Sequence, residues 1–131
     1  MATVGVMSVR LPYDPRAART ARELVDELLV ARGADEELRQ DAALVVHELV
    51  MNSVTHGKPG PDGDIELAWQ EIGTQLEISV EDCGTGGKVE VRHPDDEASN
   101  GRGLAIVAAL STSWWVDHST GTRVTARLTL V

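Results

Sequence analysis

The chain has 131 residues, enough for one domain with a hydrophobic core and too few for two of ordinary size. It carries 21 Asp and Glu against 12 Lys and Arg, a formal net charge of −9, which argues against direct binding to nucleic acid or to an anionic membrane surface. The single cysteine, Cys83, excludes an internal disulfide, and no membrane-spanning run or secretory signal is found. We therefore expect one reduced, cytoplasmic domain over residues 1–131.

The hydropathy pattern, with the residues typical of helix starts, helix ends and turns, predicts eight helices and strands. Asp14-Pro15 and Asp35 are typical of helix starts, and Gly33 is typical of a helix end. We expect, in chain order, an edge strand over 3–12, helices over 14–31 and 35–55, strands over 64–70 and 75–81, a loop over 88–100, a helix over 101–110, and a hairpin of strands over 113–118 and 122–131. Helices and mostly antiparallel strands in separate runs predict an α+β fold: a two-layer α/β sandwich, with the helices on one face of a mixed, mostly antiparallel sheet.

The second helix carries a polar pair beside its apolar arc. Glu48 and Asn52 are four residues apart, so they lie about 40° from one another on the helix. A carboxylate and a carboxamide so placed can point into one cleft, where the amide oxygen suits Mg²⁺ and the carboxylate can accept a proton. The spacing alone fits an ordinary solvent-facing pair as well, and both interpretations stay open.

A glycine-rich turn, Asp82-Cys83-Gly84-Thr85-Gly86-Gly87, follows the second strand of the central pair. An Asp at a strand end can accept a hydrogen bond from the amino group of a buried ring, and the glycines let the backbone approach that ring or take positive φ. The turn is not the dinucleotide fingerprint, because the third spaced glycine and the following helix are missing. An ordinary glycine-rich turn fits the same residues.

Two further glycine motifs lie in the C-terminal part. Asn100-Gly101-Arg102-Gly103-Leu104 opens an apolar helix, whose free N–H groups are typical of an anion site to which Arg102 can add a charged contact. The motif is not a Walker A loop, because no Gly-Lys-Ser/Thr follows. Gly121-Thr122, at the start of the last strand, indicates by itself only a turn.

Three of these motifs, in this order, resemble the nucleotide-binding boxes of the GHKL ATPase superfamily, whose fold is the Bergerat fold. Residues 48–57 resemble the N box, and residues 80–86 and 101–107 the two glycine boxes. The similarity runs from about residue 17 to residue 131. Within the superfamily the chain is most similar to the small anti-sigma-factor serine/threonine kinases, because a carboxylate leads the N box, His-Gly ends it and the lid is short.

The resemblance implies a role for each motif residue. It implies that Glu48 is the general base, that Asn52 ligates Mg²⁺, and that Asp82 binds the adenine amino group. The other residues implied at the nucleotide, around the adenine or the phosphates, are Gly84, Gly86, Gly101, Arg102, Gly103, Leu104 and Thr122. A lid over roughly 88–100 is implied above the phosphates.

The resemblance also implies a function. This is an ATP- and Mg²⁺-dependent protein serine/threonine kinase that acts as an anti-sigma factor, binding a sigma factor and phosphorylating a STAS-type anti-anti-sigma protein. A homodimer is implied as well. The alternative is a non-catalytic nucleotide-binding module that regulates a transcription factor by sequestration. The catalytic domain of a sensor histidine kinase is disfavoured, because only about 16 residues precede the first helix and leave no room for a phosphoacceptor hairpin.

Overall fold

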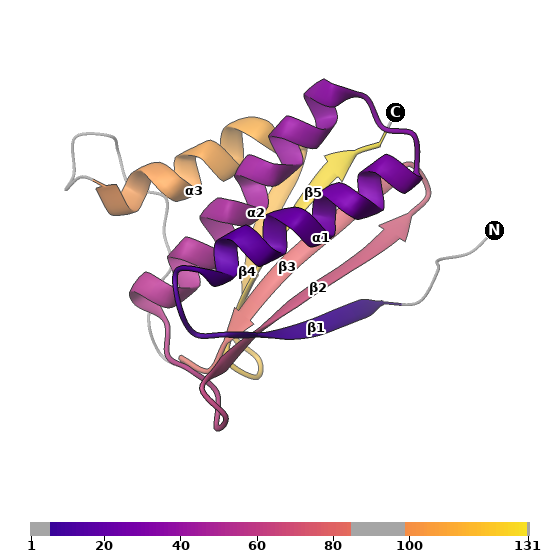
Figure 1. Cartoon of the computed structure of the whole chain (residues 1–131). Coiled ribbons are helices and arrows are strands. Elements are labelled where there is room, and N and C mark those ends of the chain that lie inside the picture. Colours follow the sequence, from indigo (N-terminus) through magenta and orange to yellow (C-terminus); the bar gives the residue numbers. More distant parts are fainter. Residues whose placement is uncertain (1–5, 85–98, 131) are drawn as a thin grey trace.

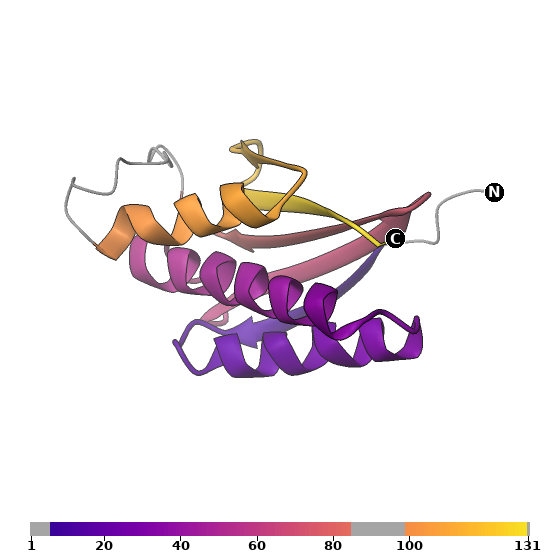
Figure 2. The same cartoon turned by 90° about the horizontal axis from the view of Figure 1, so that it is seen from above.

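The computed structural model describes residues 6–84 and 99–130, the stretch 99–102 by its helical backbone alone. Three helices cover one face of a five-stranded sheet (Figures 1 and 2). In chain order the elements are β1 (Met7–Pro12), α1 (Ala17–Ala31), α2 (Glu36–His56), β2 (Asp64–Ile72), β3 (Gln75–Asp82), α3 (Ser99–Leu110), β4 (Ser113–Asp117) and β5 (Thr122–Thr129). Over the described ranges, no helix has both the length and the hydropathy to cross a membrane.

The strand order is β1-β2-β3-β5-β4, so β3 is the central strand and β1 is an edge strand, as its weak alternation predicted. Hairpins join β2 to β3 and β4 to β5, and β5 returns beside β3 in the opposite direction. All four pairings between the described strands are antiparallel, so the sheet there is antiparallel and not mixed. The predicted two-layer α+β architecture is confirmed.

The second helix starts at a side-chain cap, whereas the first helix follows a turn and has no such cap. The Asp35 carboxylate accepts a hydrogen bond from the Leu38 amide at 2.9 Å, which caps α2 as predicted. The start of α1 lies later than expected, at Ala17. Asp14 accepts the Arg16 amide at 2.8 Å through its side chain and the Ala17 amide at 2.9 Å through its carbonyl, so a turn precedes the helix.

The core lies between the helices and the covered face of the sheet. Leu76, Ile78 and Val80 of β3 point to this face and are 0% exposed, as their alternation predicted. α2 runs between α1 and α3 across the sheet (Figure 1), and its apolar side chains fill the middle of the core. α3 begins at Ser99, two residues before the predicted start, so Gly101 and Gly103 lie inside the helix.

Candidate functional site

A buried carboxylate stands at the end of β3. Asp82 is 3% exposed, and its Oδ1 accepts hydrogen bonds from the amides of Gly84 at 2.7 Å and Lys58 at 3.3 Å. Burial raises the pKa of Asp82 above its ordinary value, and the hydrogen bonds from Gly84, Lys58 and the Ser53 side chain offset this only in part. A further hydrogen-bond donor would therefore stabilise the ionised form of this carboxylate.

Two glycines lie directly against this carboxylate. A Cβ at Gly57 would overlap all three atoms of the Asp82 carboxylate, and a Cβ at Gly84 would lie 2.8 Å from Asp82 Oδ1. Gly57 ends α2 and Gly84 follows β3, so the bare backbones of two distant segments meet at one side chain. Because glycine has no Cβ, both backbones can pack this closely against the carboxylate and hold it in place.

Tyr13 fixes the position of the Gly57 backbone by a hydrogen bond. No sequence pattern predicted Tyr13 as a site residue. Its hydroxyl donates to the Gly57 carbonyl at 2.7 Å, across 44 positions of sequence. Burial, and then the negative charge of Asp82, raise the pKa of Tyr13, so the phenol keeps the proton that it donates.

Thr122 supports the turn that follows Asp82. The two residues are direct neighbours in the β3–β5 pairing, and Thr122 Oγ1 donates to the Gly84 carbonyl at 2.8 Å. At Gly121 a Cβ would overlap the Asp82 carbonyl, so this glycine lets β5 approach β3 closely. Both residues of the Gly121-Thr122 motif thus serve the Asp82 turn.

A second part of the site is a cavity of about 360 Å³ beside α2 and α3. Its lining consists of His47, Glu48, Met51, Asn52, Thr55, His56 and Gly103. Glu48 and Asn52 line one cavity, as the interpretation of a shared cleft requires. A Cβ at Gly103 would lie 2.7 Å from Glu48 Oε1, so the missing side chain at Gly103 makes room for the Glu48 carboxylate.

Arg22 contacts one of the residues that line this cavity. Arg22 Nη1 of α1 lies 2.6 Å from His47 Nδ1, and the imidazole lines the cavity beside Glu48. The helical pattern places His47 about 100° from Glu48, so the sequence did not predict His47 as a site residue. Its contact with Arg22 could not be predicted either, because Arg22 belongs to a different helix.

Some of the predicted site residues lie outside the described residues or are described by their backbone alone. Gly86 and the expected lid up to residue 98 lie outside the described residues. Gly101 and Arg102 are described by their backbone alone, in the first turn of α3. Leu104 is 2% exposed and its side chain belongs to the hydrophobic core, so it anchors α3 beneath the site.

Asn52 is the residue implied as a metal ligand. Among the described residues, no group of three or more His, Cys, Asp and Glu side chains is close enough to hold a metal ion by itself. Mg²⁺ usually binds through one or two protein oxygens and completes its octahedron with phosphate oxygens and water. The Asn52 amide beside Glu48 fits this requirement when a phosphate supplies the other ligands.

Comparisons with known proteins agree with this geometry. The sequence profile of the histidine kinase-like ATPase domain matches residues 11–128. Among solved structures 28 chains match. One is the crystal structure of the RsbU and RsbW domains of Rv1364c from Mycobacterium tuberculosis, with a TM-score of 0.73 and 27% identity over 97% of this chain and 33% of that chain. The chain thus spans a third of that structure's length. No curated protein matches it.

Proposed function

The chain belongs to the family of histidine kinase-like ATPase domains, as its likeness to the GHKL superfamily implied, and from this premise we propose that it is an ATP-dependent protein serine/threonine kinase. It acts in the cytoplasm as an anti-sigma factor, which binds a sigma factor and phosphorylates a STAS-type anti-anti-sigma protein. The observation that carries the proposal is the shared cavity of Glu48 and Asn52, bounded by Gly103 of α3. The similarity to a structure containing an RsbW domain supports the choice of branch.

The Asp82 end of the site suits an adenine ring. The carboxylate accepts amide hydrogen bonds through Oδ1 and is held in a buried, bare-backbone setting. A ring amino group can donate to it, while Gly57 and Gly84 leave room for the ring plane. In this proposal Thr122 and Tyr13 keep the two glycine backbones in place.

The Glu48 end suits phosphoryl transfer. The Asn52 amide oxygen would hold Mg²⁺, which would neutralise charge on the phosphates. The Glu48 carboxylate accepts the proton of a Ser or Thr hydroxyl on the partner protein. The hydroxyl oxygen then forms a bond to the γ-phosphorus, and the bond from that phosphorus to the ADP oxygen breaks. The α3 N-terminus, with Gly101 and Arg102 in its first turn, faces the phosphates in this proposal.

The test uses Glu48→Gln. Partners are first recovered from the source cell by pull-down with the full chain, once in ATP and once in ADP. Phosphoryl transfer to the recovered anti-anti-sigma protein is then followed by mass spectrometry, and ATP binding by calorimetry. We expect Glu48→Gln to bind ATP as the natural chain does and to transfer at least about 100-fold more slowly.

Glu37→Gln is the matched control, because it removes the same charge from the exposed first turn of the same helix. It should change neither measurement. Unchanged transfer in Glu48→Gln would refute the assignment of the base. ATP binding without any transfer by the natural chain would favour the non-catalytic module, and absence of ATP binding would refute both.

A further inference from the structure

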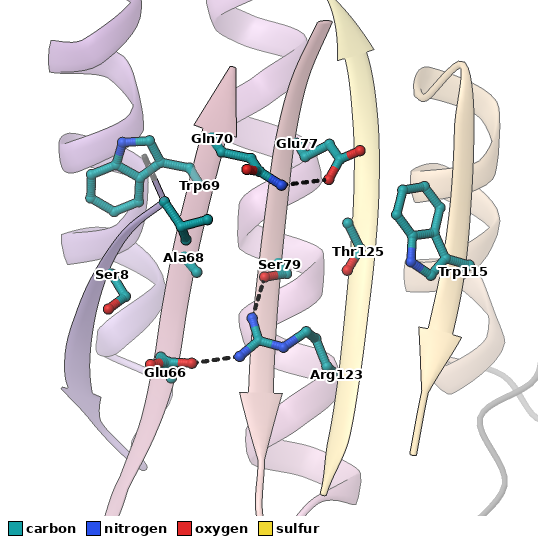
Figure 3. Close-up of a pocket in the computed structure, with 11 residues that line it drawn as sticks. Ser8, Glu66, Ala68, Trp69, Gln70, Glu77, Ser79, Trp115, Arg123 and Thr125 are labelled. Atoms are coloured by element: carbon teal, nitrogen blue, oxygen red, sulfur yellow. Dashed lines mark hydrogen bonds and ion pairs between the residues drawn. The ribbon is translucent and has the colours of Figure 1, made fainter. Parts of the chain in front are cut away.

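Arg22 of α1 is bonded differently from the other described arginines. Seven arginines pair with a carboxylate, and they are Arg10, Arg16, Arg19, Arg32, Arg39, Arg123 and Arg127. Figure 3 shows such a pair on the open face of the sheet, which the described helices leave uncovered: Arg123 bonds to Glu66. Arg22 is the remaining arginine whose side chain is described, and its partner is an imidazole, with Nη1 2.6 Å from Nδ1 of His47. Among the described residues, its positive charge has no carboxylate partner.

This contact decides which ring nitrogen of His47 carries the proton. A guanidinium has only N–H donors, so Arg22 donates and His47 Nδ1 accepts. A ring nitrogen that accepts a hydrogen bond is unprotonated, so the single proton of the neutral ring lies on Nε2. Arg22 therefore holds His47 as the Nε2–H tautomer.

The N–H of His47 is left available to a molecule in the cavity. Nδ1 and Nε2 point in nearly opposite directions from the ring, and Nδ1 is directed to Arg22, which does not line the cavity. The half-buried imidazole lines the cavity beside Glu48 and Asn52. Glu48 itself is no acceptor for this N–H, because adjacent residues of a helix do not face each other. No hydrogen bond from Nε2 is found among the described residues.

We propose that His47 Nε2–H donates to an oxygen of the γ-phosphate of ATP and that Arg22 is the positioning residue for this donor. The inference rests on the proposed function, which brings the phosphates to the cavity of Glu48 and Asn52. The hydrogen bond from Arg22 draws electron density from the ring, so Nε2–H becomes a stronger donor to an anion. ADP lacks the γ-phosphate, so the contact favours ATP over ADP.

An imidazole between Arg22 and the cavity suits a site that also contains a general base. An arginine inside the cavity would pair with Glu48, and such a pair lowers the affinity of a carboxylate for a proton. With His47 in between, the guanidinium attracts the phosphate from a distance and a neutral ring makes the contact. Glu48 then keeps its capacity to accept the proton of the attacking hydroxyl.

Two amide variants of His47 separate this role from a contact that only joins α1 to α2. In His47→Gln an amide N–H reaches the neighbourhood of Nε2, and in His47→Asn an amide oxygen stands near the place where Nδ1 accepts from Arg22. Calorimetry with Mg²⁺ measures the affinity of the full chain for ATP and for ADP. We expect His47→Asn to bind ATP about 10-fold more weakly and His47→Gln to bind it as the natural chain does, with ADP affinity unchanged in both.

Arg22→Met keeps the side-chain stem and removes the donor to Nδ1. It should weaken ATP binding about 3- to 10-fold in the natural background and have little effect in the His47→Gln background, whose amide needs no partner to fix its protons. Nitrogen chemical shifts of the His47 ring, read by NMR without nucleotide, should report the Nε2–H tautomer in the natural chain and a mixture of tautomers in Arg22→Met. Arg19→Met is the matched control and should change none of these measurements, because Arg19 is an exposed arginine of the same helix that pairs with Glu23.

This inference and the proposed function fail in different ways. The inference is wrong if His47→Asn keeps the natural ratio of ATP to ADP affinity, if His47→Gln is the variant that loses ATP, or if the ring carries its proton on Nδ1. It is also wrong if ATP affinity is unchanged and only the KM for the partner protein rises, because the donor would then contact that protein. In all these cases ATP binding and transfer by the natural chain leave the proposed function standing, whereas a natural chain that binds no ATP refutes both.

Discussion

Glu81 and Asp82 are neighbours on β3 and yet belong to two different surfaces. Glu81 points to the uncovered face and lies 2.5 Å from Arg123 Nη2, with a hydroxyl donor from Thr120. Asp82 points to the helix-covered side and accepts hydrogen bonds from the backbone amides of Lys58 and Gly84. No salt bridge to Asp82 is found in the described part of the chain.

The difference shows which carboxylate has capacity for a ligand. A carboxylate that is paired with a guanidinium of the same protein is already stabilised. A hydrogen-bond donor from a ligand therefore adds little further stabilisation to it. A buried carboxylate that is held by neutral amides keeps a raised pKa and gains from each donor that a ligand brings. The covered side thus holds the carboxylate that would gain from a ligand's donor, and on the open face Glu66 and Glu81 are paired with Arg123 of the same chain.

The largest change in stability is expected from a steric clash at the Asp82 carboxylate, in Gly57→Ala. The new Cβ would overlap the Asp82 carboxylate, so either α2 or β3 must shift. Overpacking of this kind costs about 2 to 3 kcal/mol. We expect that loss in the free energy of unfolding by urea, together with loss of ATP binding by calorimetry.

Lys58→Ala is the control for this substitution. It adds no atom near Asp82 and keeps the Lys58 amide that donates to the carboxylate. It should bind ATP and unfold as the natural chain does. If Gly57→Ala behaved like this control, close packing of bare backbone against Asp82 would not be a requirement of the site.

A smaller effect is expected on the open face, from Arg123→Met. The substitution keeps the side-chain stem and leaves Glu66 and Glu81 without their shared cation, at a site where the arginine is 28% exposed. We expect a loss of about 1 to 2 kcal/mol, largest at low salt because the remaining carboxylates repel each other. Urea unfolding at two salt concentrations measures it. Adding Glu81→Gln to the variant should recover part of the loss, and no recovery would mean that the arginine acts by packing alone.

Local patterns were enough to predict much of the fold and part of the site. The cap at Asp35, the alternation in β3 and the four-residue spacing of Glu48 and Asn52 each depend on neighbours within one or two helical turns or along one strand. The predicted cap and strand were confirmed, apart from shifts of two or three residues at the starts of α1 and α3. Glu48 and Asn52 line one cavity, and their roles there stay predictions.

What the sequence did not predict depends on contacts between distant segments. Tyr13 meets Gly57 because the end of β1 is brought beside the end of α2, and nothing in either segment signals the other. Arg123 reaches Glu66 because β5 inserts next to β3, which sets the order of charges across the sheet. Strand order is decided by packing of the whole chain, so a local pattern does not contain it.

The smallest change in the free energy of unfolding is expected when the charge on the covered side is removed, with Asp82→Asn. Burial raises the pKa of Asp82 in the folded state above its unfolded value. The stability linked to this proton is therefore fully present below the unfolded pKa and is lost as the pH rises through the folded pKa. Above this folded pKa the natural chain folds with an ionised, desolvated carboxylate, whereas asparagine avoids that cost. We expect Asp82→Asn to lose ATP binding and yet to unfold with a free energy about 1 kcal/mol higher at pH 7.

The pH dependence separates this explanation from a general gain in packing. As the pH falls through the raised folded pKa of Asp82 toward the unfolded pKa, the carboxyl becomes protonated in the natural chain, so the advantage of the asparagine variant should shrink toward zero. Asp62→Asn removes an exposed carboxylate from the loop after α2 and should show no such trend. A stability difference that stayed constant from pH 7 to about pH 3.5 would contradict the desolvation cost, because only a charge that titrates in this range makes the difference depend on pH. If the difference does vanish, the protein keeps at Asp82 a charge that weakens its fold, and a donor from a bound ligand is the compensation that the site is built to receive.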